Sequence, residues 1–189
     1  MAPWLVGNHD TTLHGTTLTA TLSHMMWKDT YKVSSIEGYP LPWDRRDEDY
    51  AKDAWETHPY EKWEQHENWR WQLHSAGHVP GAAMVEIETP THRILHTGDL
   101  DTRDSPNTNG AQPVECDILL LEATYAGKEH PNRAEEEARF LAKVVEVVER
   151  GGIAIVPAFA SGRGQDILKI LYESGLDLNV PVSYTHLTL

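Results

Sequence analysis

Two histidines four residues apart stand in HSAGHVPGAA (residues 74–83), where small residues and a glycine surround the second histidine, His78. An imidazole in a tight, glycine-rich turn can bind a metal ion, because the backbone there can approach a ligand closely. It can also serve packing or hydrogen bonding, which is the commoner role of a lone histidine beside glycine and alanine. The spacing alone leaves both interpretations open.

Two carboxylates further along the chain change this balance. HTGDLD (residues 96–101) places Asp99 after a predicted strand and a glycine, and DILLLEATY places Glu122 at the end of a second apolar strand. Each has an ordinary structural alternative, Asp99 as a turn former and Glu122 as a cap. A histidine and two carboxylates at the ends of strands or in adjoining turns are, however, typical ligands and supporting residues of a metal site. Together they favour a metal centre.

Other residues could assist such a centre. His74 could support His78, whereas His96, on a strand before TGD, is expected to be packed or exposed rather than a ligand. Arg163 and the amides of residues 162–164 open a predicted helix and could receive a phosphate. The alternative is an arginine paired with neighbouring acidic residues. The tryptophans between residues 43 and 71 could stack on bases, but tryptophans at strand period are more typical of a core.

The elements that must position these residues follow from apolar periodicity and turn residues. Hairpins come first and strand–helix alternation follows, which predicts an α/β layered architecture. The predicted elements are an amphipathic helix over 16–32, a short exposed helix over 44–56, a half-buried strand over 69–73, a hairpin over 82–101, a strand buried on both faces over 116–125, a helix over 132–150, a buried strand over 153–160 and a helix over 162–175.

Composition limits the class of protein. The 189 residues are 40% hydrophobic and 24% charged, and no run approaches the ~20 apolar residues of a membrane span, so we expect no membrane partner. The N-terminus lacks a signal-peptide pattern, and the single Cys116 excludes an intrachain disulfide and a cysteine zinc cage. We therefore expect a cytoplasmic protein. The net charge of −13 argues against a polyanionic partner, unless bound cations reverse the local field or the surface is adapted to high salt.

Four segments carry a family resemblance. AGHVPGAA, LHTGDLD, DILLLEATYA and GGIAIVPAFASGRGQDIL occur in this order and resemble successive motifs of the metallo-β-lactamase superfamily, specifically the β-CASP nucleases. The similarity runs from about Thr16, where TxxT at 16–19 precedes Asp29, to Val180. PAFASGRGQ resembles the RNA-processing branch, which includes the endonuclease subunit of the polyadenylation machinery and archaeal relatives. The resemblance implies a partial αββα metallo-β-lactamase-like fold, followed by the start of a β-CASP α/β insertion.

The resemblance also implies roles. His78 matches a histidine that coordinates one zinc ion, and Asp99 matches the aspartate that bridges two zinc ions. Glu122 matches the acidic residue that orients a histidine protonating the leaving group. RNA is the implied substrate, with DNA as the alternative, and the whole protein could form a homodimer. Two metal ions roughly 3.5–4 Å apart can clamp a phosphodiester and activate water, which agrees with this division of labour.

The sequence departs from the family in its ligand set. The HxHxDH pattern that supplies most metal ligands is absent, because His9, Asp10 and His14 in GNHDTTLH have the wrong spacing and lie too close to TxxT. The two later histidine motifs are not reached. Ala126 replaces a usual glycine and Pro80 a usual aliphatic residue, without loss of chemistry. We therefore expect part of a longer nuclease that is inactive by itself, since two protein ligands cannot hold a zinc pair.

The resemblance further predicts the domain organisation. Residues 1–126 would form the partial metallo-β-lactamase-like domain, with the boundary just after Tyr125, and residues 127–180 would begin the β-CASP domain. Residues 181–189 are expected to be a non-native tail, because VSYTHL is what a transposon-based sequencing adaptor encodes, so His186 and Thr185 receive no function. Missing neighbouring strands would leave apolar surface uncovered and lower solubility.

Two other functions stay open at this point. A non-catalytic scaffold or RNA-binding subunit would have lost ligands, whereas His78, Asp99 and Glu122 are present. A hydrolase of small esters on the same base fold would lack the PAFASGRGQ segment. A zinc-dependent ribonuclease is the leading hypothesis.

Overall fold

The computed structural model describes residues 1–159 and 161–182, which form two compact units. Unit 1 comprises residues 1–104 and 108–122, and unit 2 comprises residues 105–107 and the chain from Ala123 onward. The assignment of residues 1–126 and 127–180 to two family domains stays a prediction. The expected tail falls outside the described residues apart from its first two positions, and so do His186 and Thr185.

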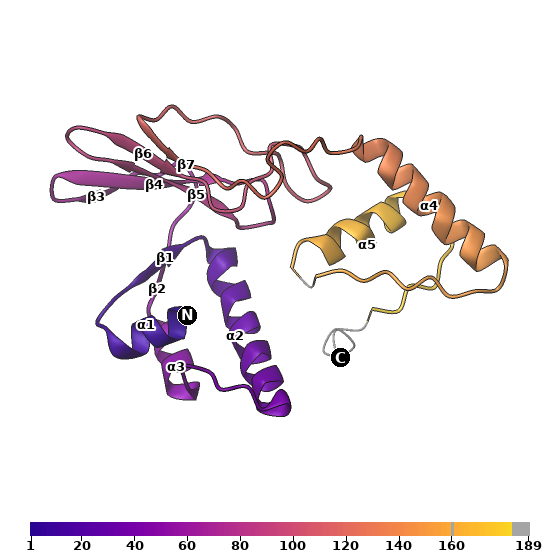
Figure 1. The fold of residues 1–189 in the computed structure, drawn as a ribbon, viewed down its shortest axis with the longest axis horizontal. Helices are drawn as coiled ribbons and strands as arrows, with labels where there is room; N and C mark the ends of the chain where they lie inside the picture. Colours follow the sequence, from indigo (N-terminus) through magenta and orange to yellow (C-terminus); the bar gives the residue numbers. More distant parts are fainter. Residues whose placement is uncertain (160, 183–189) are drawn as a thin grey trace. The chain divides into compact units, whose positions relative to one another are not determined.

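Three helices and a short parallel strand pair make up the N-terminal part of unit 1 (Figure 1). In the strand pair, His14 lies opposite Glu56. Neither the first helix nor the two short strands were predicted, because elements this short show no clear period. The elements are α1 (Ala2–Asn8), β1 (Leu13–Gly15), α2 (Thr17–Glu37), α3 (Arg45–Asp53) and β2 (Trp55–Thr57).

The predicted helix over 16–32 is α2, which is longer than expected. It begins at Thr16, whose hydroxyl accepts a hydrogen bond from the Thr19 amide, and ends at Gly38 with φ 75°. The expected amphipathic packing is wrong, since no residue of α2 is buried and Met25 and Met26 are 51% and 59% exposed. The helix contacts α3 and β2, and it packs through Trp27, which stacks with Trp55, and through Tyr31, whose ring lies beside that of Trp43.

The predicted acidic helix is α3, which has a complete capping box. The Asp44 carboxylate accepts hydrogen bonds from the Arg46 and Asp47 amides, and the Asp47 side chain accepts from the Asp44 amide. These backbone hydrogen bonds lower the pKa of Asp44. The helix is not exposed all round as expected, because Glu48 and Ala51 are buried.

A five-stranded sheet forms the rest of unit 1, with strand order β3-β4-β5-β6-β7 (Figure 1). Strands β3 to β6 are antiparallel, and β7 pairs parallel to β6 after a long irregular connection over residues 97–117. The predicted hairpin is β5–β6 and the predicted half-buried strand is β4, whereas β3 was not predicted. The strands are β3 (Glu64–His66), β4 (Trp69–Ser75), β5 (Ala83–Glu88), β6 (Arg93–His96) and β7 (Ile118–Leu120).

A small apolar core lies where the sheet meets the 97–117 connection. Its buried members are Ala76, Met84, Leu95 and Ala111, and Cys116 is among the half-buried residues that pack against them. The connection is therefore part of the fold of unit 1. Directly after Asp99, the Leu100 side chain also packs on this core and so holds the connection in place at that point.

The burial predicted for the 116–125 strand is wrong. The strand β7 exists, but its three residues are 44%, 52% and 48% exposed and Leu121 is 57% exposed. Side chains of a strand are buried by elements packed on the faces of the sheet, and among the described elements β7 has extensive contact with β6 alone. A continuous apolar run predicts two covered faces only if other elements supply the cover.

Unit 2 contains the two predicted helices, α4 (Arg133–Glu149) and α5 (Arg163–Glu173). The Asn132 side chain caps α4, and Gly151 follows its end with φ 76°. Two acidic residues lie in the first turn of α4, as the helix dipole favours.

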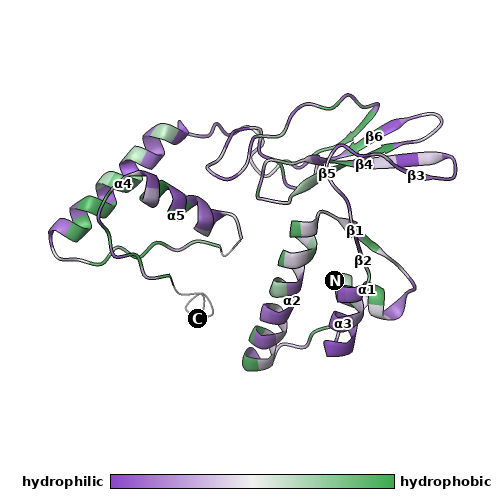
Figure 2. Ribbon diagram, turned by 180° about the vertical axis from the view of Figure 1, so that it is seen from behind, coloured by the Kyte–Doolittle hydropathy of each residue, from purple (hydrophilic) through white to green (hydrophobic). Residues whose placement is uncertain are grey.

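The buried strand predicted over 153–160 is not present in the described part of that range. Residues 153–159 form no strand, and Ile153, Ile155 and Phe159 are 88%, 86% and 84% exposed. Figure 2 shows this stretch between α4 and α5 as a hydrophobic trace. A β-strand requires a hydrogen-bonded neighbour, and no described segment of unit 2 supplies one.

The predicted mixed α/β class is confirmed, with parallel and antiparallel strand pairs and helices in both units. This composition is consistent with a partial metallo-β-lactamase-like fold. Within the described ranges, no helix combines the length and apolar character needed to cross a membrane.

Candidate metal centre

The loop that carries His78 connects β4 to β5 and depends on Gly77. This glycine has φ 67°, and a Cβ atom there would lie 2.1 Å from the Asp101 carbonyl oxygen and 2.6 Å from the Ala111 nitrogen. Both neighbours are backbone atoms that cannot move aside. The Asp101 amide also donates to the Ala76 carbonyl at 3.0 Å. The His78 loop and the segment after Asp99 are therefore in close backbone contact.

The TxxT segment holds the other end of this loop. The Thr16 and Thr19 hydroxyls donate to the Gly81 carbonyl at 2.9 and 2.8 Å. Gly81 has φ 87°, and a Cβ atom there would lie 3.0 Å from the Leu18 Cβ. The start of α2 thus fixes the turn that follows His78, which gives the TxxT pair a positioning role.

His78 and Asp99 face one another. His78 Nε2 lies 4.0 Å from Asp99 Oδ2, and the two side chains are 36% and 79% exposed. Two donor atoms on one tetrahedral zinc ion lie roughly 3.4 Å apart, given bonds of about 2.0–2.2 Å. The observed separation of 4.0 Å is too long for a hydrogen bond and exceeds that spacing by about 0.6 Å, so the two side chains would have to move slightly closer to bind one ion.

Glu122 lies next to this pair through the backbone. Its Oε1 accepts a hydrogen bond from the Leu100 amide at 2.8 Å. The Thr97 amide donates to the Leu120 carbonyl at 3.0 Å, which continues the β6–β7 pairing beyond the strands. Glu122 therefore supports the turn in which Asp99 lies.

The three predicted residues thus converge at one edge of the sheet. Asp99 and Glu122 follow the carboxyl ends of the parallel strands β6 and β7, and His78 reaches Asp99 from the β4–β5 loop. The carboxyl ends of parallel strands are where ligands commonly bind. The roles of ligand, bridge and catalytic residue stay predictions. Two protein donors fit part of a zinc site but not a complete dinuclear one.

The two neighbouring histidines have other contacts. His74 Nε2 lies 2.6 Å from Glu86 Oε2, and Glu86 is 2% exposed. Gln72 Nε2 donates to the same oxygen at 2.8 Å, so His74 belongs to a buried polar network in the sheet rather than to a support for His78. His96 is exposed, which is one of the two placements predicted for it, and its Nδ1 accepts a hydrogen bond from the Gly98 amide.

Arg163 is the first residue of α5 in unit 2. Its Nη1 lies 3.5 Å from Asp166 Oδ2, and Asp166 is 5% exposed. Arg133 Nη2 lies 3.6 Å from the same oxygen, and Asn107 Nδ2 donates to Asp166 Oδ1 at 2.8 Å. The observed contacts are those of the structural alternative, an arginine paired with an acidic neighbour. Substrate binding by Arg163 stays a prediction.

The tryptophans between residues 43 and 71 pack against the protein itself. Trp43 is buried, the Arg70 guanidinium lies 4.2 Å from the Trp63 ring centroid, and Trp55 stacks with Trp27. This agrees with the core interpretation that the sequence favoured over base stacking.

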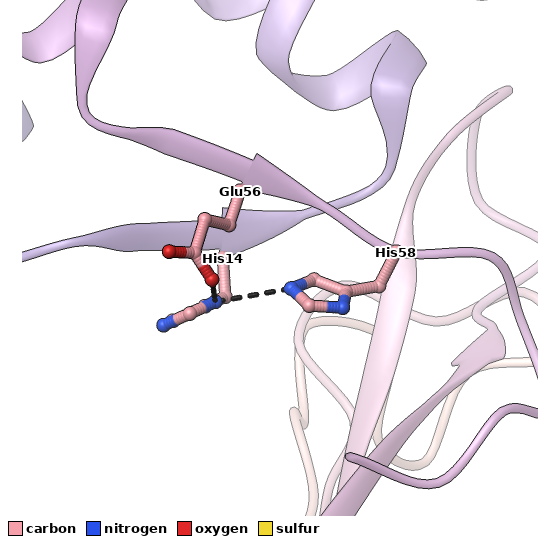
Figure 3. Close-up of side chains that lie close together, drawn as sticks. All are labelled: His14, Glu56 and His58. Carbon is pink, nitrogen blue, oxygen red and sulfur yellow. Dashed lines mark hydrogen bonds and ion pairs between the residues drawn. The ribbon is translucent and has the colours of Figure 1, made fainter.

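A group of side chains that the sequence did not predict lies between β1 and β2 (Figure 3). His14 Nδ1 lies 3.1 Å from His58 Nε2 and 3.8 Å from Glu56 Oε2. Donor atoms of these three residues all lie within 4.8 Å of one another, which makes them the one group of three or more in the described chain that could hold a metal ion.

No local sequence signal identifies this group. In sequence His14 stands near His9 and Asp10, at a spacing unsuited to a metal motif, whereas its partners lie more than forty residues away, on the parallel strand β2 and directly after it. The available clue is ETH at 56–58, in which a carboxylate and an imidazole alternate as on one face of a strand.

Comparison with known proteins finds relatives over most of the chain. It is 33% identical over 167 residues to the probable RNase MJ4 of Methanocaldococcus jannaschii, covering 86% of this chain and 39% of that protein. It is 38% identical over 152 residues to cleavage and polyadenylation specificity factor subunit 3 of Dictyostelium discoideum, and this match covers 79% of this chain and 20% of that protein. It is 34% identical over 162 residues to endoribonuclease ysh1 of Schizosaccharomyces pombe, and this match covers 82% of this chain and 21% of that protein.

The chain spans about a fifth to two-fifths of the length of these relatives. No known family profile matches the chain.

Proposed function

Because this chain is homologous to part of the β-CASP RNA-processing nucleases of the metallo-β-lactamase superfamily, we propose that the protein acts as a metal-dependent endoribonuclease. The relatives include named ribonucleases and endoribonucleases. The observation that carries the proposal is the approach of His78 Nε2 to Asp99 Oδ2 at 4.0 Å, between a half-buried imidazole and an exposed carboxylate in segments that resemble the nuclease motifs.

His78 and Asp99 would hold zinc. An imidazole nitrogen and a carboxylate oxygen are suitable donors for this ion, and their exposure leaves room for further ligands. Zinc, when bound there, would supply an activated water and neutralise charge on a phosphodiester. These two donors alone do not complete the proposed dinuclear site, so residues 1–189 by themselves are expected to be inactive.

Glu122 would keep Asp99 in position. Its carboxylate accepts the Leu100 amide hydrogen bond, so it restrains the turn directly after Asp99. Thr16 and Thr19 restrain the His78 loop from the other side through the Gly81 carbonyl. The site is thus built on hydrogen-bonded backbone, as catalytic side chains require for a fixed geometry.

RNA is the proposed substrate, and DNA cleavage is an outcome of the test. The relatives are RNA-processing nucleases, and this supports RNA for the present chain. With a net charge of −13, bound cations at the site would be needed to attract a phosphate backbone. We also propose that the protein is cytoplasmic, because its single cysteine agrees with a reducing compartment.

The test compares cleavage of labelled RNA and DNA of one sequence by the full-length protein and by Asp99→Ala. We expect RNA cleavage that falls about 100-fold or more in the variant, because a metal ligand is lost. Asp10→Ala, which removes an exposed carboxylate before β1, is the matched control and should retain activity.

Unchanged turnover in Asp99→Ala would exclude the proposed role of this residue. RNA binding without any cleavage by the unaltered protein would instead support a non-catalytic scaffold. Preferred cleavage of DNA would overturn the substrate assignment.

A further inference from the structure

We propose that His14, Glu56 and His58 form a second metal site, selective for a borderline transition-metal ion such as Zn²⁺, which shares no residue with the His78–Asp99 site. The three side chains present two imidazole nitrogens 3.1 Å apart and a carboxylate oxygen 3.8 Å from one of them (Figure 3). Figure 3 shows the rings and the carboxylate converging on one point from two neighbouring segments.

Glu64 orients the His58 ring for this purpose. Its Oε1 lies 3.1 Å from His58 Nδ1, and the His58 side chain is only 12% exposed. With Nδ1 hydrogen-bonded to this carboxylate, Nε2 is the ring nitrogen left on the side of His14, 3.1 Å from His14 Nδ1. A carboxylate that holds the far side of a histidine in this way is typical of metal-binding histidines.

The backbone around the group is fixed by hydrogen bonds. The Leu13 amide donates to the Ala54 carbonyl and the His58 amide to the Gly15 carbonyl, both at 2.9 Å. The Trp71 ring packs edge-on against both imidazoles, with centroid distances of 5.3 Å to His14 and 4.7 Å to His58. The donors are therefore positioned before any ion binds, which lowers the entropic cost of binding.

The donor set selects the class of ion. Two imidazoles and one carboxylate suit Zn²⁺, Ni²⁺ or Cu²⁺, whereas Ca²⁺ and Mg²⁺ require mostly oxygen ligands. The distance of 3.1 Å between the nitrogens is close to the roughly 3.4 Å between two ligands on a tetrahedral zinc ion. The exposure of His14 and Glu56, 41% and 65%, leaves the fourth position open to water.

An ion at this place would link β1, β2 and the segment that leads to β3. Thr16, which directly follows β1, donates to the Gly81 carbonyl of the His78 loop. Occupancy would thus stabilise the strand pair from which the TxxT contact extends. Because the ion would bind the folded state and not the unfolded chain, its binding would also raise the melting temperature of the protein.

The test is a Zn²⁺ titration of residues 1–189 by calorimetry in a His78→Ala/Asp99→Ala background, so that ions at the other site do not contribute. We expect one bound ion, with affinity reduced at least tenfold by His14→Gln, by His58→Gln and by Glu56→Gln. His92→Gln is the matched control, because His92 is an exposed histidine in the β5–β6 turn, and it should leave the affinity unchanged. Unchanged affinity in both His14→Gln and His58→Gln would overturn the proposal.

A second measurement needs no substitution. In ¹⁵N-labelled wild-type protein, Zn²⁺ should shift the resonances of His14 Nδ1 and His58 Nε2 while the His58 Nδ1 proton is retained. Shifts confined to His78 would overturn the proposal even if a variant failed to fold. Loss of RNA cleavage in Asp99→Ala has no bearing on this result, so the two proposals are tested independently.

Discussion

Gly77 shows how a single residue fixes the geometry of the proposed centre. Its missing Cβ allows the Asp101 carbonyl to approach, and this approach sets the His78 loop against the segment after Asp99. The positive φ of Gly77 alone would restrict the choice of residue less than this steric overlap does, because some other residues adopt the left-handed conformation at a modest cost in free energy.

We expect Gly77→Ala to lower the free energy of unfolding by more than about 2 kcal/mol, because the added methyl group would overlap two backbone atoms. Gly38→Ala is the matched control, since Gly38 also has positive φ but no atom lies within 4 Å of its built Cβ. Gly38→Ala should lower the free energy of unfolding by about 1 kcal/mol. Urea unfolding measures both, and equal losses in the two variants would contradict the steric argument.

The Glu88 carboxylate predicts a pH dependence. It accepts from Arg70 Nε and Nη2 at 3.0 and 2.9 Å and from Arg93 Nη2 at 3.1 Å. Hydrogen bonds from Arg70 and then Arg93 lower the pKa of Glu88 below its ordinary value of 4.5. A lowered carboxyl pKa in the folded state stabilises the fold above that ordinary value, and this contribution is lost as the pH falls through the lowered pKa.

Glu88→Gln should therefore lower the melting temperature at pH 7, and the difference from wild type should shrink as the pH falls below 4.5. Melting curves by circular dichroism across this range measure the effect. Glu115→Gln, at an exposed position, controls for the loss of one negative charge. A difference that stays constant with pH would show that the two arginine pairs do not stabilise the fold.

At the scale of residues, the motifs predicted that His78, Asp99 and Glu122 lie together, because each follows a strand that the sequence marks clearly. The His14 group was missed, since His14 and Glu56 come from two three-residue strands whose pairing has no sequence signature, and His58 directly follows the second strand. The contact of His74 with Glu86 was missed for a similar reason. Which residue lies across a strand pair depends on register, and register is not visible in either segment alone.

At the scale of elements, the TxxT contact links α2 to the β4–β5 loop. Two hydroxyls donate to one carbonyl, and Thr16 also caps the helix. Removing Thr16 would therefore affect both the helix start and the His78 loop.

We expect Thr16→Ala to destabilise the protein by about 1–2 kcal/mol, through loss of the cap and of a buried hydrogen bond. Thr19→Val should preserve most of the stability but accelerate hydrogen exchange at the Gly81 and Ala82 amides. Thr17→Ala is the control, because Thr17 is exposed at the first position of the same helix. Equal exchange rates in Thr19→Val and Thr17→Ala would argue against a positioning role.

Local signals predicted the existence of elements well. Thr16, Asp44 and Asn132 cap α2, α3 and α4 where the sequence placed the starts of these helices or within a residue of them, and the β5–β6 turn fell at Pro-Thr-His. Burial was predicted poorly, as the exposure of β7 and of residues 153–159 shows. Burial depends on neighbours contributed by distant segments, and an apolar run does not indicate whether such neighbours exist.

At the scale of the whole molecule, the exposed apolar stretch over residues 153–159 has a consequence for behaviour in solution. Its isoleucine and phenylalanine side chains are more than four-fifths exposed, which is unusual for a contiguous segment. Apolar side chains exposed side by side in this way favour association with other chains.

We therefore expect residues 1–189 to self-associate at micromolar concentration, and Ile153→Asp combined with Ile155→Asp to reduce this association. Sedimentation velocity measures it. Ile36→Asp is the control, because Ile36 is 73% exposed but stands near the end of α2, in the other unit. A monomeric wild-type chain would contradict this prediction.

The parallel pairing of β6 and β7 determines when parts of unit 1 can form during refolding. Strands β3 to β6 are joined by short turns, so they can pair early and locally. Leu95 can meet Leu119 only after residues 97–117 have been brought round, and closing such a long loop is entropically slow. Asp99 should therefore acquire its place beside His78 in one of the last events of folding, after the histidine loop is already formed.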